Sequence, residues 1–224
     1  MYTPDCKLEN STDDFPYTSW ERVYREHTPY ELPWDSSEPH PLLAALFENH
    51  RAKPGSRALD LGCGTGASSR LLADSGYDVD AWDVSATAIE RARVLSMDYS
   101  GKIRFVQGNV ITQAFTCNHT YDLILDFLFL HHVQDGDIER YFRGVRKSLR
   151  EGGRYVVGVF VQTGETEKRA SLFSDGEVRY WTSQGIQQCL HNHFQISLAS
   201  YGKAGSMEQN YPFGLFEFII KPCP

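Results

Sequence analysis

The sequence predicts an α/β fold, a doubly wound and mostly parallel sheet with helices on both faces. Three observations predict this fold class. Short apolar runs that end in an acidic residue alternate with helix-forming segments between about residues 57 and 161. A glycine-rich turn at residues 62–66 directly follows the first of these runs. The length of 224 residues suits one domain with a sizeable core, so we expect a single domain over residues 1–224.

Five strands and three helices are expected in the alternating region. The first strand leads into the glycine turn, and the helix after the turn begins at the small residues that follow it. The later strands end at an acidic residue or beside a glycine. The expected strands are residues 58–61, 77–85, 103–107, 121–126 and 154–160, and the expected helices between them are residues 67–75, 86–97 and 137–149.

Less regular segments are expected on either side of this region. Residues 1–40 form a leader with one short helix and several prolines, and a second helix near 41–51 precedes the first strand. We expect residues 162–182 to form an insert over the edge of the sheet and near the substrate. Up to about residue 180 this segment is polar and has no regular pattern. Thr182 is placed to cap a helix that ends at His191, and two further strands follow, near 194–198 and 213–220.

The glycine turn has the spacing Gly62-x-Gly64-x-Gly66, with the small side chain of Cys63 inside it. Glycine lets the backbone turn sharply and lets a ligand approach atoms that a Cβ would cover. The following helix directs unpaired N–H groups toward the turn. We therefore expect a nucleotide-like cofactor here, although the spacing is not the G-x-G-x-x-G of dinucleotide-binding proteins. The alternative is a plain strand-to-helix turn.

Polar residues at the ends of three strands narrow the choice of cofactor. Asp60 precedes the turn, where it would repel a pyrophosphate and favour a cationic or zwitterionic group. Asp83 lies about 20 residues after the glycines, where a carboxylate can accept hydrogen bonds from both hydroxyls of a ribose. The donor and acceptor of Asn109 suit the edge of an adenine. Val84 and Val110, next to these residues, complete the expected contacts.

Together these residues resemble the class I S-adenosylmethionine-dependent methyltransferases. The resemblance implies S-adenosylmethionine as cofactor, S-adenosylhomocysteine as product, and a Rossmann-like methyltransferase fold with seven strands, the last two antiparallel. Asn109 departs from the family, in which an aspartate is more usual at this place. The matching segments, in the family's order and spacing, are residues 59–66, 83–85, 108–109, 121–124 and 149–153.

The aromatic leader also resembles one branch of that family, the thiopurine, tellurite-resistance and thiol/halide methyltransferases. Trp20 lies in the expected short helix, and Trp34 lies in a Pro-Trp-Asp turn. Aromatic rings over a sulfonium attract it by cation–π contact and exclude water, so we expect residues 1–40 to form a lid over the cofactor. The alternative is that these rings only cover the edge of the sheet.

The expected reaction transfers a methyl group to a small molecule, most readily to the sulfur of a thiol or a similar soft nucleophile. Such a nucleophile needs alignment more than a base. The alternative is transfer to oxygen or nitrogen with His131 or His132 as the base, since both follow the fourth strand at the expected ligand edge. Asp126, at the end of that strand, either contacts the cofactor's amino group or the acceptor, or only caps the strand.

Composition excludes several other classes of function. A net charge of −7 without a basic run disfavours a nucleic-acid substrate, and no apolar run approaches the length of a membrane span. The five cysteines form no C-x-x-C pair, so we expect no metal site, reduced thiols and a cytoplasmic protein. The sequence does not indicate an oligomeric state.

Overall fold

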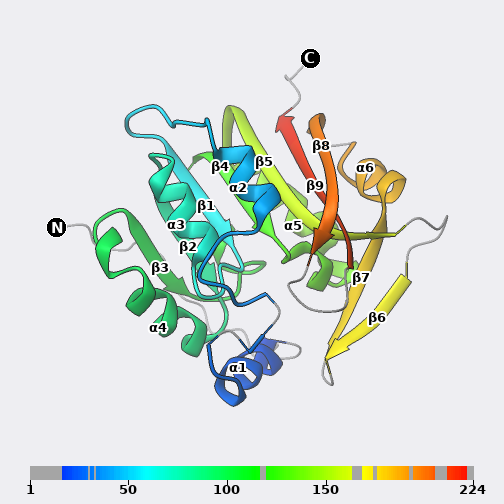
Figure 1. Ribbon diagram of the computed structural model, residues 1–224. Coiled ribbons are helices and arrows are strands. Elements are labelled where there is room, and N and C mark those ends of the chain that lie inside the picture. The colour runs from blue at the N-terminus through cyan, green and yellow to red at the C-terminus, as the bar shows by residue number, and fades with distance from the viewer. Residues whose placement is uncertain are drawn as a thin grey trace.

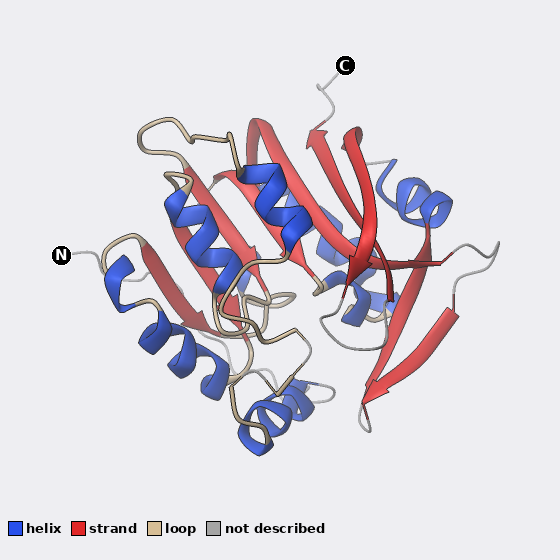
Figure 2. Ribbon diagram, in the orientation of Figure 1, coloured by secondary structure: helices blue, strands red, loops and turns tan. Residues whose placement is uncertain are grey.

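The computed structural model describes residues 17–29, 31–32, 34–116, 120–162, 168–173, 176–191, 194–204 and 211–220. Within these residues a single sheet carries helices on both faces (Figure 1; Figure 2), which confirms the predicted fold class. None of the helices in these ranges has the length and apolar character needed to cross a membrane.

Seven strands form the sheet that the sequence predicts. They are β1 (Arg57–Leu61), β2 (Asp78–Asp83), β3 (Ile103–Gln107), β4 (Tyr121–Phe127), β5 (Leu149–Gln162), β8 (Phe194–Ala204) and β9 (Tyr211–Ile220). Their order is β3-β2-β1-β4-β5-β9-β8, in which β1 to β5 are parallel and the last two pairs are antiparallel. The carboxyl ends of the parallel strands therefore share one edge, and the site is built there.

Residues 168–173 and 176–182, which belong to the predicted irregular insert, form two paired strands instead. They are β6 (Lys168–Phe173) and β7 (Gly176–Thr182), which pair antiparallel and bring the sheet to nine strands. β9 pairs with β5 only as far as Phe160, whereas β5 continues to Gln162. The end of β5 would otherwise expose unpaired backbone groups, and β7 covers them by pairing in parallel with residues 161–162.

Helices cover the sheet from two sides (Figure 2). Five helices form these layers: α2 (Pro41–Phe47), α3 (Ala67–Asp74), α4 (Ala86–Leu95), α5 (Ile138–Ser148) and α6 (Ser183–His191). The described residues also form α1 (Tyr17–Glu26) and the short 3-10 turns η1 (Met97–Tyr99), η2 (Ala114–Thr116), η3 (Leu130–His132) and η4 (Asp135–Asp137). On one face Leu43, Leu72 and Ile89 of α2, α3 and α4 are buried together. On the other face Tyr141 and Ile186 of α5 and α6 are buried in a second cluster. These two layers hold the central strands in place.

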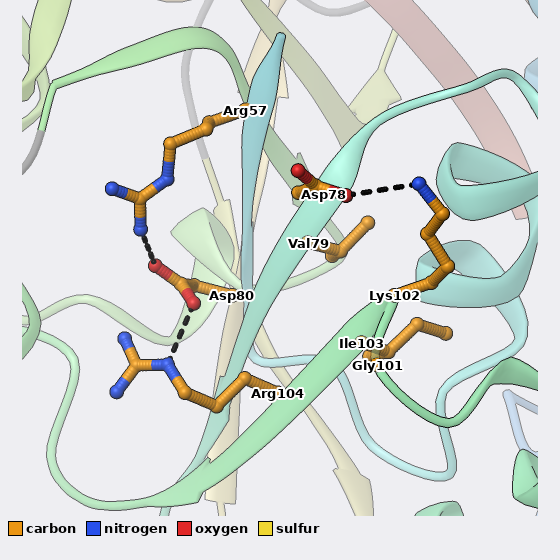
Figure 3. Close-up of a pocket in the computed structure, with 8 residues that line it drawn as sticks. All are labelled: Arg57, Asp78, Val79, Asp80, Gly101, Lys102, Ile103 and Arg104. Atoms are coloured by element: carbon orange, nitrogen blue, oxygen red, sulfur yellow. Dashed lines mark hydrogen bonds and ion pairs between the residues drawn. The ribbon is translucent and has the colours of Figure 1, made fainter. Parts of the chain in front are cut away.

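The amino-terminal edge of the sheet carries a network of ion pairs (Figure 3). Asp80, which is buried, accepts hydrogen bonds from Arg57 Nη2 at 2.7 Å, Arg104 Nε at 2.8 Å and the hydroxyl of Tyr121 at 2.8 Å. A separate, exposed pair joins Lys102 to Asp78 at 3.2 Å. The charged side chains of this network line a cavity of about 380 Å³ at the opposite edge from the site. Burial alone would raise the pKa of Asp80, but its three partners outweigh burial and lower it.

We expect Asp80→Ala to lower the free energy of unfolding by about 2–3 kcal/mol, because it leaves two guanidinium groups and one hydroxyl without their shared acceptor. Urea denaturation measures this loss. Because the pKa of Asp80 is lowered by folding, its contribution is complete above about pH 4 and is lost as the pH falls through the lowered value. Lys102→Ala, which breaks the exposed pair, is the control and should cost less than about 1 kcal/mol.

Candidate active site

The sequence-predicted site residues gather where β1, β2 and β4 end. The glycine turn follows β1, Asp83 ends β2, and residues 128–132 follow β4. The leader with α1 lies beside these loops rather than on either face of the sheet (Figure 1). The structure therefore brings together the turn, the acids and the aromatic leader, as the sequence predicts.

The glycine turn requires its glycines. Gly62, Gly64 and Gly66 have φ values of +69°, +53° and +84°, which other residues rarely adopt. A Cβ on Gly62 would lie 2.8 Å from the ring of Phe129, and one on Gly64 would lie 2.8 Å from the hydroxyl of Tyr24. The turn therefore requires glycine both for its left-handed backbone and because the side chains of Phe129 and Tyr24 pack directly against it. Within the turn the buried thiol of Cys63 donates weakly to the carbonyl of Gly64 at 3.7 Å, as expected for a small filler.

We expect Gly64→Ala to weaken cofactor binding by about tenfold or more and to loosen the leader, because the new methyl group meets the hydroxyl of Tyr24 and favours another backbone conformation. Calorimetric titration measures the affinity, and the fluorescence of the leader tryptophans measures its docking. Gly101→Ala is the matched control, since Gly101 also has a positive φ but nothing within 4 Å of a Cβ.

Asp83 faces the glycine turn and also fixes its backbone by a hydrogen bond. Its Oδ2 accepts a hydrogen bond from the backbone N–H of Gly64 at 2.9 Å, and its Oδ1 accepts one from the N–H of Ser85 at 2.9 Å. Burial raises the pKa of Asp83 despite these bonds, and the carboxylate of Glu21 raises it further. Each carboxylate oxygen has a second lone pair, so the predicted contacts to a ribose remain chemically available. Val84 follows and is partly buried.

Asp60 is almost fully buried, at 1% exposure, beneath the turn. Its Oδ2 accepts a hydrogen bond from the hydroxyl of Ser69 in α3 at 2.5 Å. Burial raises the pKa of Asp60 to about 7; the bond from Ser69 lowers it in part, and the carboxylates of Asp83 and Asp126 raise it. Asp60 therefore lies near two other carboxylates, and this fits its predicted role toward a cationic group.

Asp126 is the predicted site residue that the structure places in a different role. It is fully buried, and its Oδ1 accepts hydrogen bonds from the N–H groups of Phe129 at 3.0 Å and Leu130 at 2.9 Å. Its Oδ2 accepts bonds from the hydroxyls of Tyr141 and Tyr155. Four donors of the chain itself bond to its two oxygens, and this favours the alternative role of capping β4 over contact with the cofactor or the acceptor. Burial raises its pKa to about 6.

Asp60, Asp83 and Asp126 form a cluster of buried carboxylates that has no cationic partner among the described residues. All of their hydrogen-bond donors are neutral: backbone N–H groups, the hydroxyl of Ser69 and two tyrosine hydroxyls. In the described ranges, no lysine or arginine forms an ion pair with any of the three. Buried carboxylates are ordinarily paired with a positive charge, so this site favours a cationic ligand.

The leader is attached to the site by two contacts that the sequence did not indicate. Glu21 of α1 accepts hydrogen bonds from the hydroxyl of Ser85 at 2.8 Å and from the N–H and hydroxyl of Thr87 at 3.1 and 2.7 Å. The hydroxyl of Thr65 in the glycine turn donates to Asp35 at 2.5 Å. Tyr24, between these contacts, is buried against the turn. Long-range contacts of this kind leave no local pattern in a sequence.

Both predicted leader tryptophans lie in this docked segment. Trp20 meets Trp34 edge to face, with ring centroids 5.5 Å apart, and the indole N–H of Trp34 donates to the hydroxyl of Tyr24 at 3.2 Å. Trp20 also meets the ring of His132 edge to face at 4.6 Å. The leader therefore joins the glycine turn to the histidine segment, and this arrangement favours the predicted lid over a simple cover for the sheet edge.

His131 and His132 form a short series of rings with the hairpin. His131 stacks on Phe160 at 4.9 Å, Phe160 stacks on Tyr180 of β7 at 5.5 Å, and the two histidine rings are 4.2 Å apart. Burial lowers the pKa of His131 well below its ordinary value and that of His132 to about 3. Both rings are neutral at pH 7 and would be weak bases. Nδ1 of His131 is buried and makes no hydrogen bond within the described part of the chain.

Asn109 and Val110 lie in the loop that follows β3, the strand next to β2. The Oδ1 of Asn109 accepts a hydrogen bond from the N–H of Ile111 at 2.9 Å, so this acceptor closes a turn and leaves the amide Nδ2 as the group for an adenine edge. The side chain of Val110 is buried in the core cluster, where it can contribute to a cofactor contact only through its backbone.

Comparisons with known proteins agree with this geometry. Residues 58–153 match a family described as a methyltransferase domain. A probable thiol methyltransferase 2 of Arabidopsis thaliana is 29% identical over 143 residues, which are 63% of this chain and 61% of the relative. A ubiquinone biosynthesis O-methyltransferase of Vibrio cholerae serotype O1 is 33% identical over 120 residues, 54% of this chain and 46% of the relative. The chain thus spans about half to three fifths of these relatives.

Solved structures share the fold at low sequence identity. A Burkholderia thailandensis 1,6-didemethyltoxoflavin-N1-methyltransferase, with its substrate and S-adenosylhomocysteine bound, has a TM-score of 0.66 and 18% identity over 92% of this chain and 84% of its own. A structure from work on the conversion of a disulfide bond into a thioacetal group during echinomycin biosynthesis has a TM-score of 0.71 and 19% identity, over 92% and 93%.

Proposed function

We propose that this chain, which carries a class I S-adenosylmethionine-dependent methyltransferase domain, transfers a methyl group from that cofactor to a small molecule. The observation that carries the proposal is the pair of buried carboxylates, Asp60 and Asp83, beside the left-handed glycine turn. A dinucleotide would bring a pyrophosphate to this acidic cluster and be repelled. A ligand with a sulfonium and an ammonium group compensates the buried negative charge instead.

Individual residues take distinct roles in this proposal. The backbone of the glycine turn and Asp60 hold the amino acid portion of S-adenosylmethionine, and Asp83 accepts hydrogen bonds from its ribose. Trp20 and Trp34 close over the site and exclude water. When bound, the cofactor supplies an electrophilic methyl group on a positively charged sulfur. The chain's contribution is to align and desolvate the reactants, because methyl transfer to a soft nucleophile needs little proton chemistry.

The proposed acceptor is the sulfur of a small thiol or a similar soft nucleophile. His131 and His132, the two candidate bases, are both neutral and weakly basic in the structure. A thiol loses its proton near neutral pH without strong assistance, whereas an alcohol or a phenol needs a base. The relative named as a probable thiol methyltransferase and the aromatic leader support the same acceptor class.

A second candidate function is transfer to oxygen or nitrogen with a histidine as base. Nδ1 of His131 favours it, because this atom is buried and has no hydrogen-bond partner among the described residues, and such an atom is often kept for function. O- and N-methyltransferases among the similar proteins support it as well. The two candidates differ in how the rate depends on pH. Only the second requires that the rate fall when an enzyme group is protonated, and that this pH dependence disappear in His131→Phe or His132→Phe.

A methyl-transfer assay with radiolabelled S-adenosylmethionine tests both functions. The acceptors are thiols, halides, thiopurines, amines and phenols in parallel. We expect label to move to thiols first, at rates that follow the thiolate fraction of the acceptor and not an enzyme group. Transfer to phenols or amines alone would replace the first function by the second, and transfer to none of them would contradict both.

A further inference from the structure

We propose that Glu21 is a positioning residue, which couples docking of the leader to the carboxylate of Asp83 through Ser85. The inference rests on the proposed function, in which Asp83 accepts hydrogen bonds from the ribose. It extends that function to the leader, because docking of α1 and binding of the ribose then stabilise each other. Glu21 acts through Ser85 and does not need to touch the cofactor itself.

Ser85 is fully buried and joins three parts of the molecule. Its backbone N–H donates to Oδ1 of Asp83 at 2.9 Å, and its hydroxyl donates to Oε2 of Glu21 at 2.8 Å. The hydroxyl oxygen also accepts the N–H of Ala88 at 3.0 Å, so Ser85 is the N-cap of α4. The other oxygen of Asp83 accepts the N–H of Gly64 at 2.9 Å. One connected series of contacts therefore runs from α1 through Ser85 and Asp83 to the glycine turn.

The carboxylate of Glu21 lies at the amino terminus of α4. Besides the bond from Ser85, it accepts the N–H of Thr87 at 3.1 Å and the hydroxyl of Thr87 at 2.7 Å. The unpaired N–H groups and the dipole of a helix attract a negative charge to this end. Burial alone would raise the pKa of Glu21, but the bonds from Thr87 and Ser85 outweigh burial and lower it. Both carboxylate oxygens of Glu21 are thus bonded within the chain, and α1 is attached at the residue that also bonds to Asp83.

Docking of the leader brings the negative charge of Glu21 toward that of Asp83. Burial raises the pKa of Asp83 and Glu21 raises it further, as expected for two carboxylates that repel each other. Hydroxyl groups that donate to Asp83 stabilise its negative charge, so the leader should dock more readily when a ribose is bound. By linkage, a docked leader favours binding of the ribose by the same factor.

Calorimetric titration with S-adenosylmethionine and methylthioadenosine tests the inference. The second ligand keeps the ribose and lacks the amino acid portion. We expect Glu21→Ala to weaken both ligands by the same factor, about five- to tenfold, because the series of contacts ends at the carboxylate proposed for the ribose. Ser85→Ala removes the hydroxyl and keeps the N–H that bonds to Asp83, and it should weaken both ligands similarly. The double variant should lose little more than either single variant, since both changes break one contact.

Amide hydrogen exchange of α1 measures the reciprocal effect. S-Adenosylmethionine should slow exchange in α1 of the wild-type protein, and it should do so by a several-fold smaller factor in Glu21→Ala. A residue that only held the leader in place would change exchange in α1 equally with and without the ligand. This measurement and the titration of Glu21→Ala test the inference even if Ser85→Ala does not fold, because Glu21 lies outside the sheet.

Two variants are the matched controls. Thr87→Val removes another bond to Glu21 but leaves Ser85 and Asp83 in contact, so it should speed exchange in α1 and weaken methylthioadenosine by about twofold or less. Glu26→Ala removes the same charge from an exposed position on α1 and should change neither readout.

The outcomes separate this inference from the proposed function. Wild-type affinity of Glu21→Ala for both ligands, or a loss in Thr87→Val as large as that in Glu21→Ala, would overturn the inference and leave the proposed function intact. Fully additive losses in the double variant would also overturn it. If S-adenosylmethionine did not bind to the wild-type protein, the proposed function itself would be wrong.

Discussion

Asp83→Ala is expected to weaken binding of S-adenosylmethionine by about 2–3 kcal/mol, which is about 30- to 150-fold in the dissociation constant. Two effects combine in this loss. The variant lacks the carboxylate proposed to accept hydrogen bonds from the ribose, and it releases the N–H of Gly64, which Asp83 holds at 2.9 Å in the glycine turn. Calorimetric titration of the folded variant measures the change.

Asp78→Ala is the matched control for this prediction. Asp78 begins the same strand that Asp83 ends, and its side chain is exposed at the opposite edge of the sheet. We expect its affinity for the cofactor to equal that of the wild type. If Asp83→Ala bound the cofactor as tightly as Asp78→Ala, the proposed position of the ribose would be wrong.

Asp126→Ala is expected to lower the free energy of unfolding by about 3–5 kcal/mol, because it leaves two backbone N–H groups and two tyrosine hydroxyls buried without an acceptor. Urea denaturation followed by circular dichroism measures the loss. Asp126→Asn keeps one acceptor oxygen and should lose less.

Asp122→Ala provides the comparison on the same strand. Asp122 is half-buried and accepts hydrogen bonds from Arg150 and from the backbone N–H of Arg57, so we expect a smaller loss of about 1–2 kcal/mol. A fully stable Asp126→Ala that lost only activity would show that Asp126 acts on the cofactor or acceptor after all, and that the assignment to strand capping is mistaken.

Local patterns were sufficient to predict much of the fold and of the cofactor site. The carboxyl ends of parallel strands meet at one edge, so acids at the ends of two strands and a glycine turn can be placed together without a structure. Asp60, Asp83 and the turn accordingly lie where they were expected. The antiparallel strands β8 and β9 also follow the prediction.

Roles that depend on distant partners could not be predicted in this way. Asp126 shares the strand-end pattern of Asp60 and Asp83, and only its hydroxyl donors from α5 and β5 distinguish its role. Glu21 had no local signal, because its partners Ser85 and Thr87 are tens of residues away in the chain. The lowered pKa values of the two histidines likewise arise from burial by the whole fold.

The hairpin of β6 and β7 shows that amino-acid composition alone does not predict whether a segment forms strands. Its polar sequence suggested an irregular insert, but strand pairing depends on whether an edge is available, and β5 offers one beyond the end of its pairing with β9. This hairpin places Tyr180 of β7 against Phe160, and Phe160 in turn stacks on His131. The hairpin is therefore in contact with the histidine segment.

The most direct test of the central claim is a calorimetric comparison of S-adenosylmethionine with oxidised nicotinamide adenine dinucleotide on the wild-type protein. Both ligands contain adenosine, but only the first brings a sulfonium and an ammonium group to the buried carboxylates, whereas the second brings a pyrophosphate. We expect one molecule of S-adenosylmethionine to bind per chain and the dinucleotide to show no binding. Binding of the dinucleotide, or of neither ligand, would contradict the assignment of this site to a methyltransferase cofactor.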